Sequence, residues 1–138
     1  MFMIGKYAFL SNYYPCKVPY EGIWYSNSEA AFQAQKEKSP RRRKLYREAP
    51  PNIAKQMGRR AELREGWEII KDKIMYEVVK AKFQHNSQLR QQLLEVTEPI
   101  VEDNTWNDTY WGKCNGKGAN KLGEILERVR DEFMEQER

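Results

Sequence analysis

Glu65–His85, EGWEIIKDKIMYEVVKAKFQH, contains the longest helical pattern of this chain. Apolar residues recur within it at the helical period: Trp67, Ile70, Ile74, Val78 and Ala81. Residues at this spacing share one face of a helix, so the stripe can pack inward while the charged residues stay in water. We therefore expect a long amphipathic helix whose apolar stripe supplies the core.

Two further helices are predicted on the C-terminal side of this stretch. Ser87 can cap a helix that carries Leu89, Leu93 and Val96. A closing amphipathic helix is expected from about Ala119 to Gln136, with an apolar face of Leu122, Ile125, Leu126, Val129 and Phe133. Between these helices, Pro99-Ile100-Val101 predicts a short strand.

A β-hairpin is predicted near the N-terminus. Lys17–Tyr20 and Ile23–Tyr25 are rich in β-branched and aromatic residues, and Glu21-Gly22 lies between them as a two-residue turn. Ser26-Asn27-Ser28-Glu29 then matches a capping box, in which a serine caps a helix and a glutamate three residues later reaches back. This helix is expected to run to about Lys38.

Prolines mark the next boundaries. Ser39-Pro40 combines an N-cap residue with proline at the first helical position, which predicts a second helix. Pro50-Pro51 is expected to end that helix and to open a short one to Met57, with Gly58 as its C-terminal stop. We find no internal repeat or linker, and the length suits one domain over residues 1–138.

Composition excludes several classes of protein. A chain that is 40% hydrophobic and 12% aromatic is too apolar for disorder, and no run approaches the ~20 apolar residues that span a bilayer. The N-terminal residues do not form a secretion signal, so we expect a soluble cytoplasmic protein that does not bind membranes. Cys16 and Cys114 fit neither a zinc pattern nor a disulfide framework, and Cys114 is only a minor candidate for a nucleophile.

The net charge of +4 gives only a weak indication of partners. The run Arg41-Arg42-Arg43-Lys44, with Arg59-Arg60 nearby, could bind phosphates or nucleic acid. Acidic residues interrupt this basic character, namely Glu37, Glu48 and Glu62. We therefore favour a solvated helix face over a nucleic-acid surface.

The segment Glu102–Gly112, EDNTWNDTYWG, is too polar for a core although it holds three aromatic residues. Asn104 and Asp108 cannot be buried beside Trp106 and Trp111 without hydrogen-bond partners, so a half-open cleft suits the segment better. Aromatic faces can hold a flat heterocycle while carboxylates stabilise developing positive charge. This combination is the one needed to break a bond between a sugar and a nitrogen base.

The first helix carries a polar stripe. Glu29, Gln33 and Lys36 are spaced at i, i+4 and i+7, so they project from one face. Burial would lower the pKa of Lys36 and make it a nucleophilic amine, while a neighbouring carboxylate would raise that pKa. On spacing alone, a capping Glu29 and a solvated Lys36 are the more economical interpretation.

The loop Gly112–Lys121, GKCNGKGANK, leads into the last helix. Its glycines, the helix start and a basic residue such as Lys117 or Lys121 could bind a phosphate, although a flexible loop explains the pattern equally well. It is not a Walker loop. His85 is the only histidine and there is no cluster of metal-ligand residues, so we expect neither a catalytic triad, a metal nor a cofactor.

Several blocks of the chain carry a recognisable likeness. They are Phe9–Pro15, FLSNYYP; Ser28–Lys36, SEAAFQAQK; Ala81–Phe83, AKF; Asn104–Gly112, NTWNDTYWG; and Gly116–Gly123, GKGANKLG. In this order they resemble the NADAR family, with its YbiA-like N-glycosidases. The resemblance spans nearly the whole chain and implies an α+β domain, mainly helical with a small β-hairpin.

The resemblance also implies an activity. Members hydrolyse N-glycosidic bonds in which a ribose carbon carries an exocyclic amine, in phosphorylated ribosylamino-pyrimidine intermediates of riboflavin synthesis or in ADP-ribose attached to guanine. The partner is therefore expected to be a small phosphorylated glycosylamine or an ADP-ribosylated nucleic acid. A glycosylamine can open to an imine that a lysine captures as a Schiff base. The oligomeric state is left open.

By motif match, the family's site residues fall on named positions of this chain. Glu29 is expected to be a proton shuttle or a cation stabiliser, and Lys36 the amine nucleophile. Asp108 is expected to be a catalytic carboxylate that acts on ribose hydroxyls or on the developing cation. The expected substrate-binding residues are Trp111 as a stacking platform, with Asn104, Lys82, Trp106, Lys117 and Asn120. Lys82 competes with Lys36 for the role of nucleophile.

One position departs from the family. Many members have histidine directly after the glutamate, where this chain has Ala30. The departure weakens the transfer of a substrate from the family to this chain. It also keeps open a different class of function, a non-catalytic module that binds nucleotides or ADP-ribose.

Overall fold

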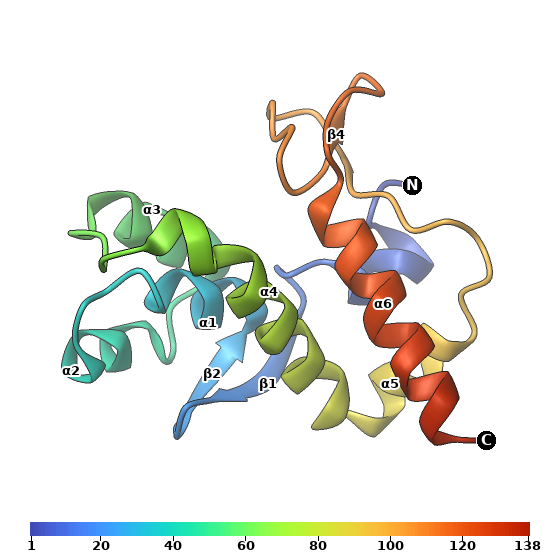
Figure 1. Cartoon of the computed structure of the whole chain (residues 1–138), viewed down its shortest axis with the longest axis horizontal. Helices are drawn as coiled ribbons and strands as arrows, with labels where there is room; N and C mark the ends of the chain where they lie inside the picture. Colours follow the sequence, from blue (N-terminus) through green and yellow to red (C-terminus); the bar gives the residue numbers. More distant parts are fainter. The chain divides into compact units, whose positions relative to one another are not determined.

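A computed structural model describes all 138 residues, Met1–Arg138. The chain forms two compact units, one made of residues Asn12–Asn86 and the other of Met1–Ser11 with Ser87–Arg138 (Figure 1). Helices dominate both units, and the strands are short. No helix is long and apolar enough to cross a membrane.

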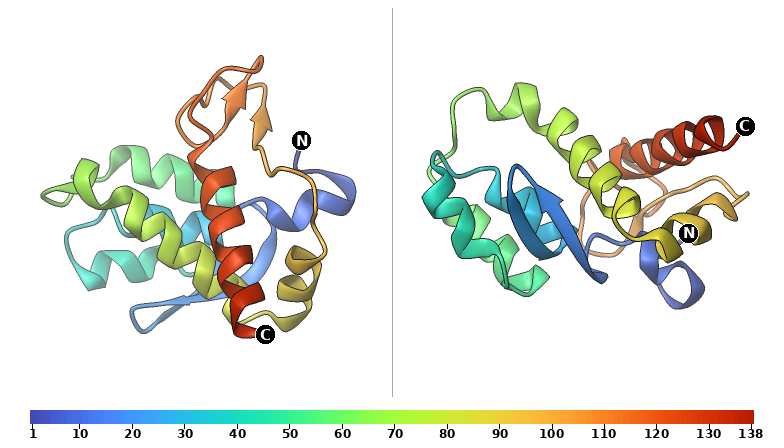
Figure 2. Two further views of the ribbon diagram at one scale, coloured as in Figure 1. Left: turned by 45° about the vertical axis from the view of Figure 1, so that its right-hand side comes forward. Right: turned by 90° about the horizontal axis from the view of Figure 1, so that it is seen from below.

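The unit Asn12–Asn86 begins with the predicted hairpin. β1 (Pro15–Tyr20) pairs antiparallel with β2 (Ile23–Asn27). Glu21 and Gly22 both have positive φ, 47° and 82°, which a primed two-residue turn requires. The two strands lie beside α1 (Ser28–Ala34) and the long helix α4 (Trp67–Gln84), as Figure 2 shows. The hairpin prediction is confirmed.

The first helix starts and ends differently from the prediction. α1 (Ser28–Ala34) is capped by Asn27, whose Oδ1 accepts the Ala30 N–H at 2.7 Å. Ser26 is not the cap, because its hydroxyl and its N–H both donate to the Arg47 carbonyl. The helix stops at Ala34 rather than near Lys38, and Lys36 lies in the turn that follows.

The proline signals are largely confirmed. α2 (Pro40–Arg43) is capped by the Ser39 hydroxyl, which accepts the Arg42 N–H at 3.3 Å. It continues into a 3-10 turn, η2 (Lys44–Tyr46). α3 (Pro51–Arg60) begins where expected but passes through Gly58. The prediction of Gly58 as a stop is wrong, since this glycine is a buried interior residue of the helix.

The long helix supplies the core of its unit, as predicted. In α4, Trp67, Ile74 and Val78 are buried, while Ile70 and Ala81 are partly exposed. The buried face also includes Lys82, which the apolar stripe did not predict.

The unit formed by Met1–Ser11 and Ser87–Arg138 packs its helices against each other. It contains η1 (Gly5–Leu10), α5 (Ser87–Leu94) and α6 (Lys121–Gln136), and α5 contacts α6. Both predicted helices are present. α5 includes Ser87 as its first residue and ends at Leu94, before Val96, and α6 starts two residues later than predicted.

The strand predicted at 99–101 is wrong. Instead, β3 (Asp103–Asn104) pairs in parallel with β4 (Lys113–Cys114). Side chains form hydrogen bonds with both backbone groups of Ile100. The Glu127 carboxylate accepts its N–H at 2.9 Å, and the Asn120 amide donates to its carbonyl at 3.0 Å. No strand partner is therefore needed at this position.

Candidate functional site

The polar residues of α1 form a connected group in the unit Asn12–Asn86. Gln33 Nε2 donates to Glu29 Oε2 at 2.8 Å, one helical turn apart. The Glu29 N–H donates to the Asn12 carbonyl at 3.1 Å, which ties the helix start to the segment before the hairpin. Glu29 is half-buried, and Gln33 is 5% exposed. The carboxylate is thus partly accessible and held by a buried amide.

Lys36 shares the electrostatic environment of Glu29. Burial lowers the pKa of the Lys36 amine, the negative charge of Glu29 raises it, and the positive charges of Arg59 and Lys55 lower it again. The first of these effects is the largest, so the pKa of Lys36 lies below that of an ordinary lysine. The side chain is only half-buried, so the Lys36 amine stays accessible to a ligand.

A dense network fixes the turn that carries Lys36. The Arg64 N–H donates to the Lys36 carbonyl at 2.9 Å, and Arg64 Nη1 donates to the Gln35 carbonyl at 3.3 Å. The buried carboxylate of Glu37 accepts hydrogen bonds from Arg42 at 2.9 Å and from the Tyr46 hydroxyl at 2.6 Å. The sequence did not identify Glu37 as a buried residue of this network, since no spacing signal distinguishes it from a solvated glutamate.

Lys82 lies in a different environment from Lys36. It is 1% exposed, and burial lowers the pKa of its amine to about 8, partly offset by Cys16. Its ammonium lies 5.9 Å from the ring centroid of Tyr14 and 5.0 Å from that of Phe83.

In the other unit, Asn104 and Asp108 organise the loop that contains them. Asn104 Oδ1 accepts the N–H groups of Trp106 and Asp108 at 3.3 and 3.1 Å, and its Nδ2 donates to the Asp108 carbonyl at 2.9 Å. Asp108 Oδ1 accepts the N–H groups of Tyr110 and Trp111 at 3.1 and 2.9 Å. Buried Asn104 is therefore fully engaged with backbone, whereas Asp108 keeps its Oδ2 oxygen outside these bonds.

The aromatic residues of this loop differ in exposure. Trp111 is half-buried and packs edge-on against Tyr110, with ring centroids 4.8 Å apart. Trp106 is 57% exposed. One indole is thus fixed by its neighbour while the other lies open to solvent, in agreement with a polar segment that is not core.

Asn120 and Lys117 occupy contrasting positions in the glycine loop. Asn120 adopts a left-handed backbone conformation, φ 53°, and its amide bridges the Glu102 N–H and the Ile100 carbonyl, each at 3.0 Å. Both ends of this side chain are therefore occupied by backbone. Lys117 lies in a tight turn, paired with Cys114 through both backbone groups, and its side chain is exposed.

The structure thus groups the predicted residues in two sets. Glu29 and Lys36 lie together on α1 and the turn after it, and Asn104, Asp108 and Trp111 are joined through one loop. Each set lies within one compact unit. Gln33, which holds Glu29, was recognised in sequence only as part of a polar stripe.

Comparison with known proteins gives a consistent picture. The family model of the NADAR domain matches residues 2–134. The chain is 35% identical over 131 residues to N-glycosidase YbiA of Escherichia coli strain K12, covering 92% of this chain and 82% of that protein. It is 30% identical over 134 residues to N-glycosidase Npun_R5314 of Nostoc punctiforme, covering 92% and 86%.

Two further likenesses concern a longer relative and a solved structure. The chain is 33% identical over 134 residues to riboflavin biosynthesis protein VVA0006 of Vibrio vulnificus, covering 94% of this chain and 36% of that protein. The NMR structure of the E. coli protein YbiA matches with a TM-score of 0.84 and 34% identity, covering 95% of this chain and 80% of the other. The mainly helical α+β fold is therefore that of YbiA.

Proposed function

Since this chain belongs to the NADAR family, we propose that it is an N-glycosidase, a hydrolase that cleaves the bond between a ribose carbon and an amine nitrogen. The names of its relatives support this reaction class. The observation that carries the proposal is the half-buried Lys36 amine, whose pKa is lowered by burial and raised by the nearby Glu29 carboxylate. A tuned amine beside a carboxylate is suited to imine chemistry.

We propose that the reaction proceeds through a Schiff base on Lys36. A glycosylamine opens its ribose ring to an imine at C1, and the proton of the amine nitrogen passes to the ring oxygen, which becomes a hydroxyl. Lys36 transfers its ammonium proton to Glu29, and its Nζ then adds to C1 while one Nζ proton passes to the imine nitrogen. The bond between C1 and the base nitrogen breaks, and the departing amine takes its electron pair together with the proton from Glu29. Water finally replaces Lys36 at C1, leaving the sugar aldehyde.

Lys36 suits the nucleophilic role better than Lys82. A nucleophile must reach the ribose carbon, and Lys36 keeps part of its side chain exposed, while Lys82 is 1% exposed and faces aromatic rings. A pKa near 8 makes Lys82 a reactive amine in principle, but burial limits its access. We therefore propose that Lys82 is not the nucleophile and that it helps to shape the region around a bound substrate.

Asp108 and Trp111 are proposed as contributors from the polar aromatic loop. Asp108 Oδ1 holds two backbone N–H groups, so its Oδ2 is the oxygen proposed to accept a ribose hydroxyl or to stabilise positive charge. Trp111 is proposed to stack on the heterocycle and exposed Trp106 to extend that surface. Lys117 is proposed to bind a phosphate. Asn104 and Asn120 act by shaping the loop.

The proposed substrates share a phosphorylated ribose on an exocyclic amine. A ribosylamino-pyrimidine phosphate is the first candidate, because one relative is named a riboflavin biosynthesis protein. ADP-ribose attached to guanine is the second, since it presents the same glycosylamine linkage. Incubating the protein with each in parallel, and following the released base by mass spectrometry, tests the proposal. If no base is released from either substrate, the proposed activity is contradicted.

Trapping with borohydride tests the mechanism separately. Reduction during turnover is expected to give a stable adduct that adds the mass of the sugar to Lys36, and Lys36→Met is expected to abolish it. If the adduct forms on Lys82, or if the enzyme cleaves its substrate without forming any adduct, Lys36 is not the nucleophile. The proposed N-glycosidase activity would be unaffected by that result.

A nucleotide-binding module is the alternative function. It is favoured by Ala30, which replaces the histidine of many members and is fully buried. This module predicts tight binding of ADP-ribose with no release of base from any glycosylamine. Calorimetry with ADP-ribose beside the mass-spectrometric assay separates the two.

A further inference from the structure

The Gln33 amide is buried between α1 and α3, and its two ends have different surroundings. Nε2 donates to Glu29 Oε2 at 2.8 Å. Oε1 is buried and has no hydrogen-bond partner. It lies against Gly58 of α3, where a Cβ atom would be 1.9 Å from Oε1 and 2.9 Å from Cδ. The amide therefore fits only because residue 58 has no side chain.

Packing alone does not explain a glutamine at this position. A buried amide oxygen without a partner costs free energy that an apolar side chain of the same size would avoid. Its one hydrogen bond is to a carboxylate, and such charge-assisted bonds are among the stronger ones in proteins. The hydrogen bond from Gln33 to Glu29 is thus what offsets the cost of burying this amide.

The orientation of the amide follows from the same contact. If the amide were reversed, Oε1 would face the Glu29 carboxylate, and two acceptors would repel each other. The observed orientation favours the ionised form of Glu29, because an N–H donor stabilises a carboxylate. The charged groups that act on the neighbouring Lys36 amine are Glu29 itself, Lys55 and Arg59 from α3, and Glu68 from α4.

We propose that Gln33 is a positioning residue that fixes the Glu29 carboxylate in its ionised form, and that Gly58 provides the space which holds Gln33 in place. The proposal rests on the proposed function in assigning Glu29 its role as proton shuttle. An ionised, fixed carboxylate can accept the Lys36 proton at the start of the reaction. Gly58 then influences catalysis through Gln33 without touching the substrate.

A double-mutant cycle tests this chain of contacts. Gln33→Met removes the donor while keeping most of the volume, and Gly58→Ala forces the amide to move. Each is expected to lower kcat by about 10- to 100-fold, the worth of one hydrogen bond to a charged group. The acid limb of the profile of kcat against pH is expected to move to higher pH. Gln56→Ala, an exposed change on α3, is the matched control.

The third variant is Gly58→Ala in a Gln33→Ala background, compared with Gln33→Ala alone. The contacts with Oε1 and Cδ are then absent and only the Cβ of residue 33 stays near, at 3.3 Å, so Gly58→Ala is expected to have little further effect on kcat. If Gly58 instead matters only for the packing of α3, Gly58→Ala lowers activity to the same extent in both backgrounds. Equal losses of activity from Gly58→Ala in both backgrounds would overturn the proposal.

A titration by NMR separates this inference from the proposed function. The ¹³C signal of the Glu29 carboxyl, assigned by its loss in Glu29→Gln, is followed against pH without substrate. Its midpoint is expected to rise in Gln33→Met and in Gly58→Ala. An unchanged midpoint overturns the inference whatever the turnover. A raised midpoint in a protein that cleaves no glycosylamine supports the coupling and overturns the proposed function alone.

Discussion

Asp108 illustrates at the scale of a residue how one side chain can organise a loop and also be proposed for chemistry. One carboxylate oxygen accepts the N–H groups of Tyr110 and Trp111, which sets the loop, and the other is the oxygen proposed to meet a ligand. Glu29 is likewise held by a neighbouring side chain, since Gln33 Nε2 donates to its Oε2, and it is proposed for proton transfer as well. Substitutions that keep an acceptor but remove the charge can therefore separate the two tasks.

Glu29→Gln and Asp108→Asn are each expected to preserve the fold and to lower kcat by roughly 10²–10⁴, because each removes a group proposed to transfer a proton or stabilise charge. The amide oxygen of asparagine can still accept the Tyr110 and Trp111 N–H groups. Steady-state kinetics with circular dichroism measures both effects. Exposed Glu48→Gln is the control, and turnover within a few-fold of wild type in either test variant would refute its assigned role.

Lys82 gives a prediction about stability and pH. Its pKa is about 8 in the folded protein and near 10.5 when unfolded, so the unfolded chain binds more protons between these values. Stability should therefore rise with pH across this window, and the cost of the buried charge, of the order of 3 kcal/mol, is fully present below pH 8.

Lys82→Met is expected to remove this pH dependence. Urea unfolding at about pH 7 and about pH 9.5 should show wild type gaining about 2 kcal/mol more than the variant. Exposed Lys73→Met on the same helix should behave like wild type. Parallel pH dependence in wild type and Lys82→Met would show that the Lys82 ammonium is not destabilised by burial.

At the scale of the element, close backbone approaches decide how the polar loop joins α6. Asn120 substitutes for a strand partner by bonding the backbone on both sides of Val101, and Gly123 lies directly against it. A Cβ atom at Gly123 would lie 2.2 Å from the Ile100 carbonyl and 2.4 Å from Asn120 Nδ2. The first turn of α6 therefore tolerates no side chain at this position.

Gly123→Ala is expected to destabilise the protein by about 1–3 kcal/mol, the usual cost of overpacking, despite the higher helix propensity of alanine. Chemical denaturation measures the change. Glu124→Ala, next to it and exposed, should have little effect. A Gly123→Ala protein as stable as wild type would mean that the loop moves away at no cost.

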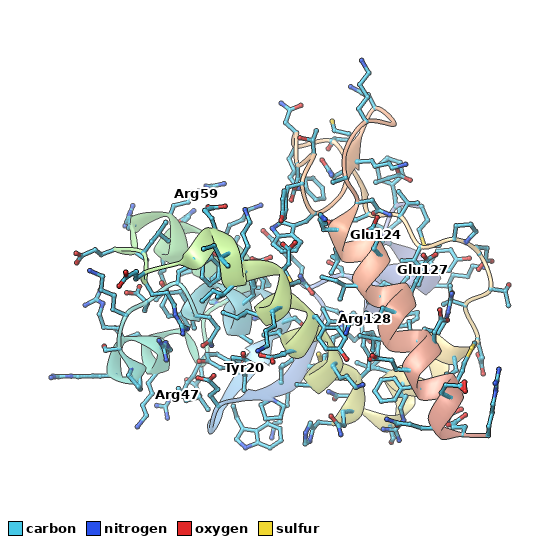
Figure 3. All side chains as sticks on the ribbon, viewed as in Figure 1. Tyr20, Arg47, Arg59, Glu124, Glu127 and Arg128 are labelled. Atoms are coloured by element: carbon cyan, nitrogen blue, oxygen red, sulfur yellow. The ribbon has the colours of Figure 1, made fainter.

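At the scale of the whole molecule, charge is distributed unevenly between the two units. Residues 12–86 contain 16 Lys and Arg against nine Asp and Glu, whereas the remaining residues contain eight against eleven. Figure 3 shows Arg47 and Arg59 on the first unit, and Glu124, Glu127 and Arg128 along α6 of the second. The excess of positive charge therefore belongs to the unit that carries Lys36, and we propose that it helps to attract a phosphorylated substrate.

The KM for a ribosylamine phosphate is accordingly expected to rise several-fold between about 50 and about 500 mM salt, because added ions screen this attraction. The KM for the same ribosylamine without phosphate should change little. Assays of both substrates over the salt series measure the difference. If the KM values of both substrates depend equally on salt, the salt acts on the protein and not on the attraction of the phosphate.

The sequence by itself determined the elements whose signals are local. The periods of α4 and α6, the Glu21-Gly22 turn and the start of α2 at Ser39-Pro40 depend on neighbouring residues, so each was predicted closely. The family, and with it the candidate roles of Glu29 and Asp108, could also be recognised from sequence blocks.

Only the tertiary structure decided the features that depend on distant partners. Arg47 takes the Ser26 N–H, so Asn27 becomes the cap, and Gln33 needs an empty position at Gly58, so that glycine lies inside a helix. Asn104 and Asn120 bond backbone groups that spacing could not identify. A polar side chain in sequence has many possible partners, and only the fold selects which hydrogen bonds satisfy it.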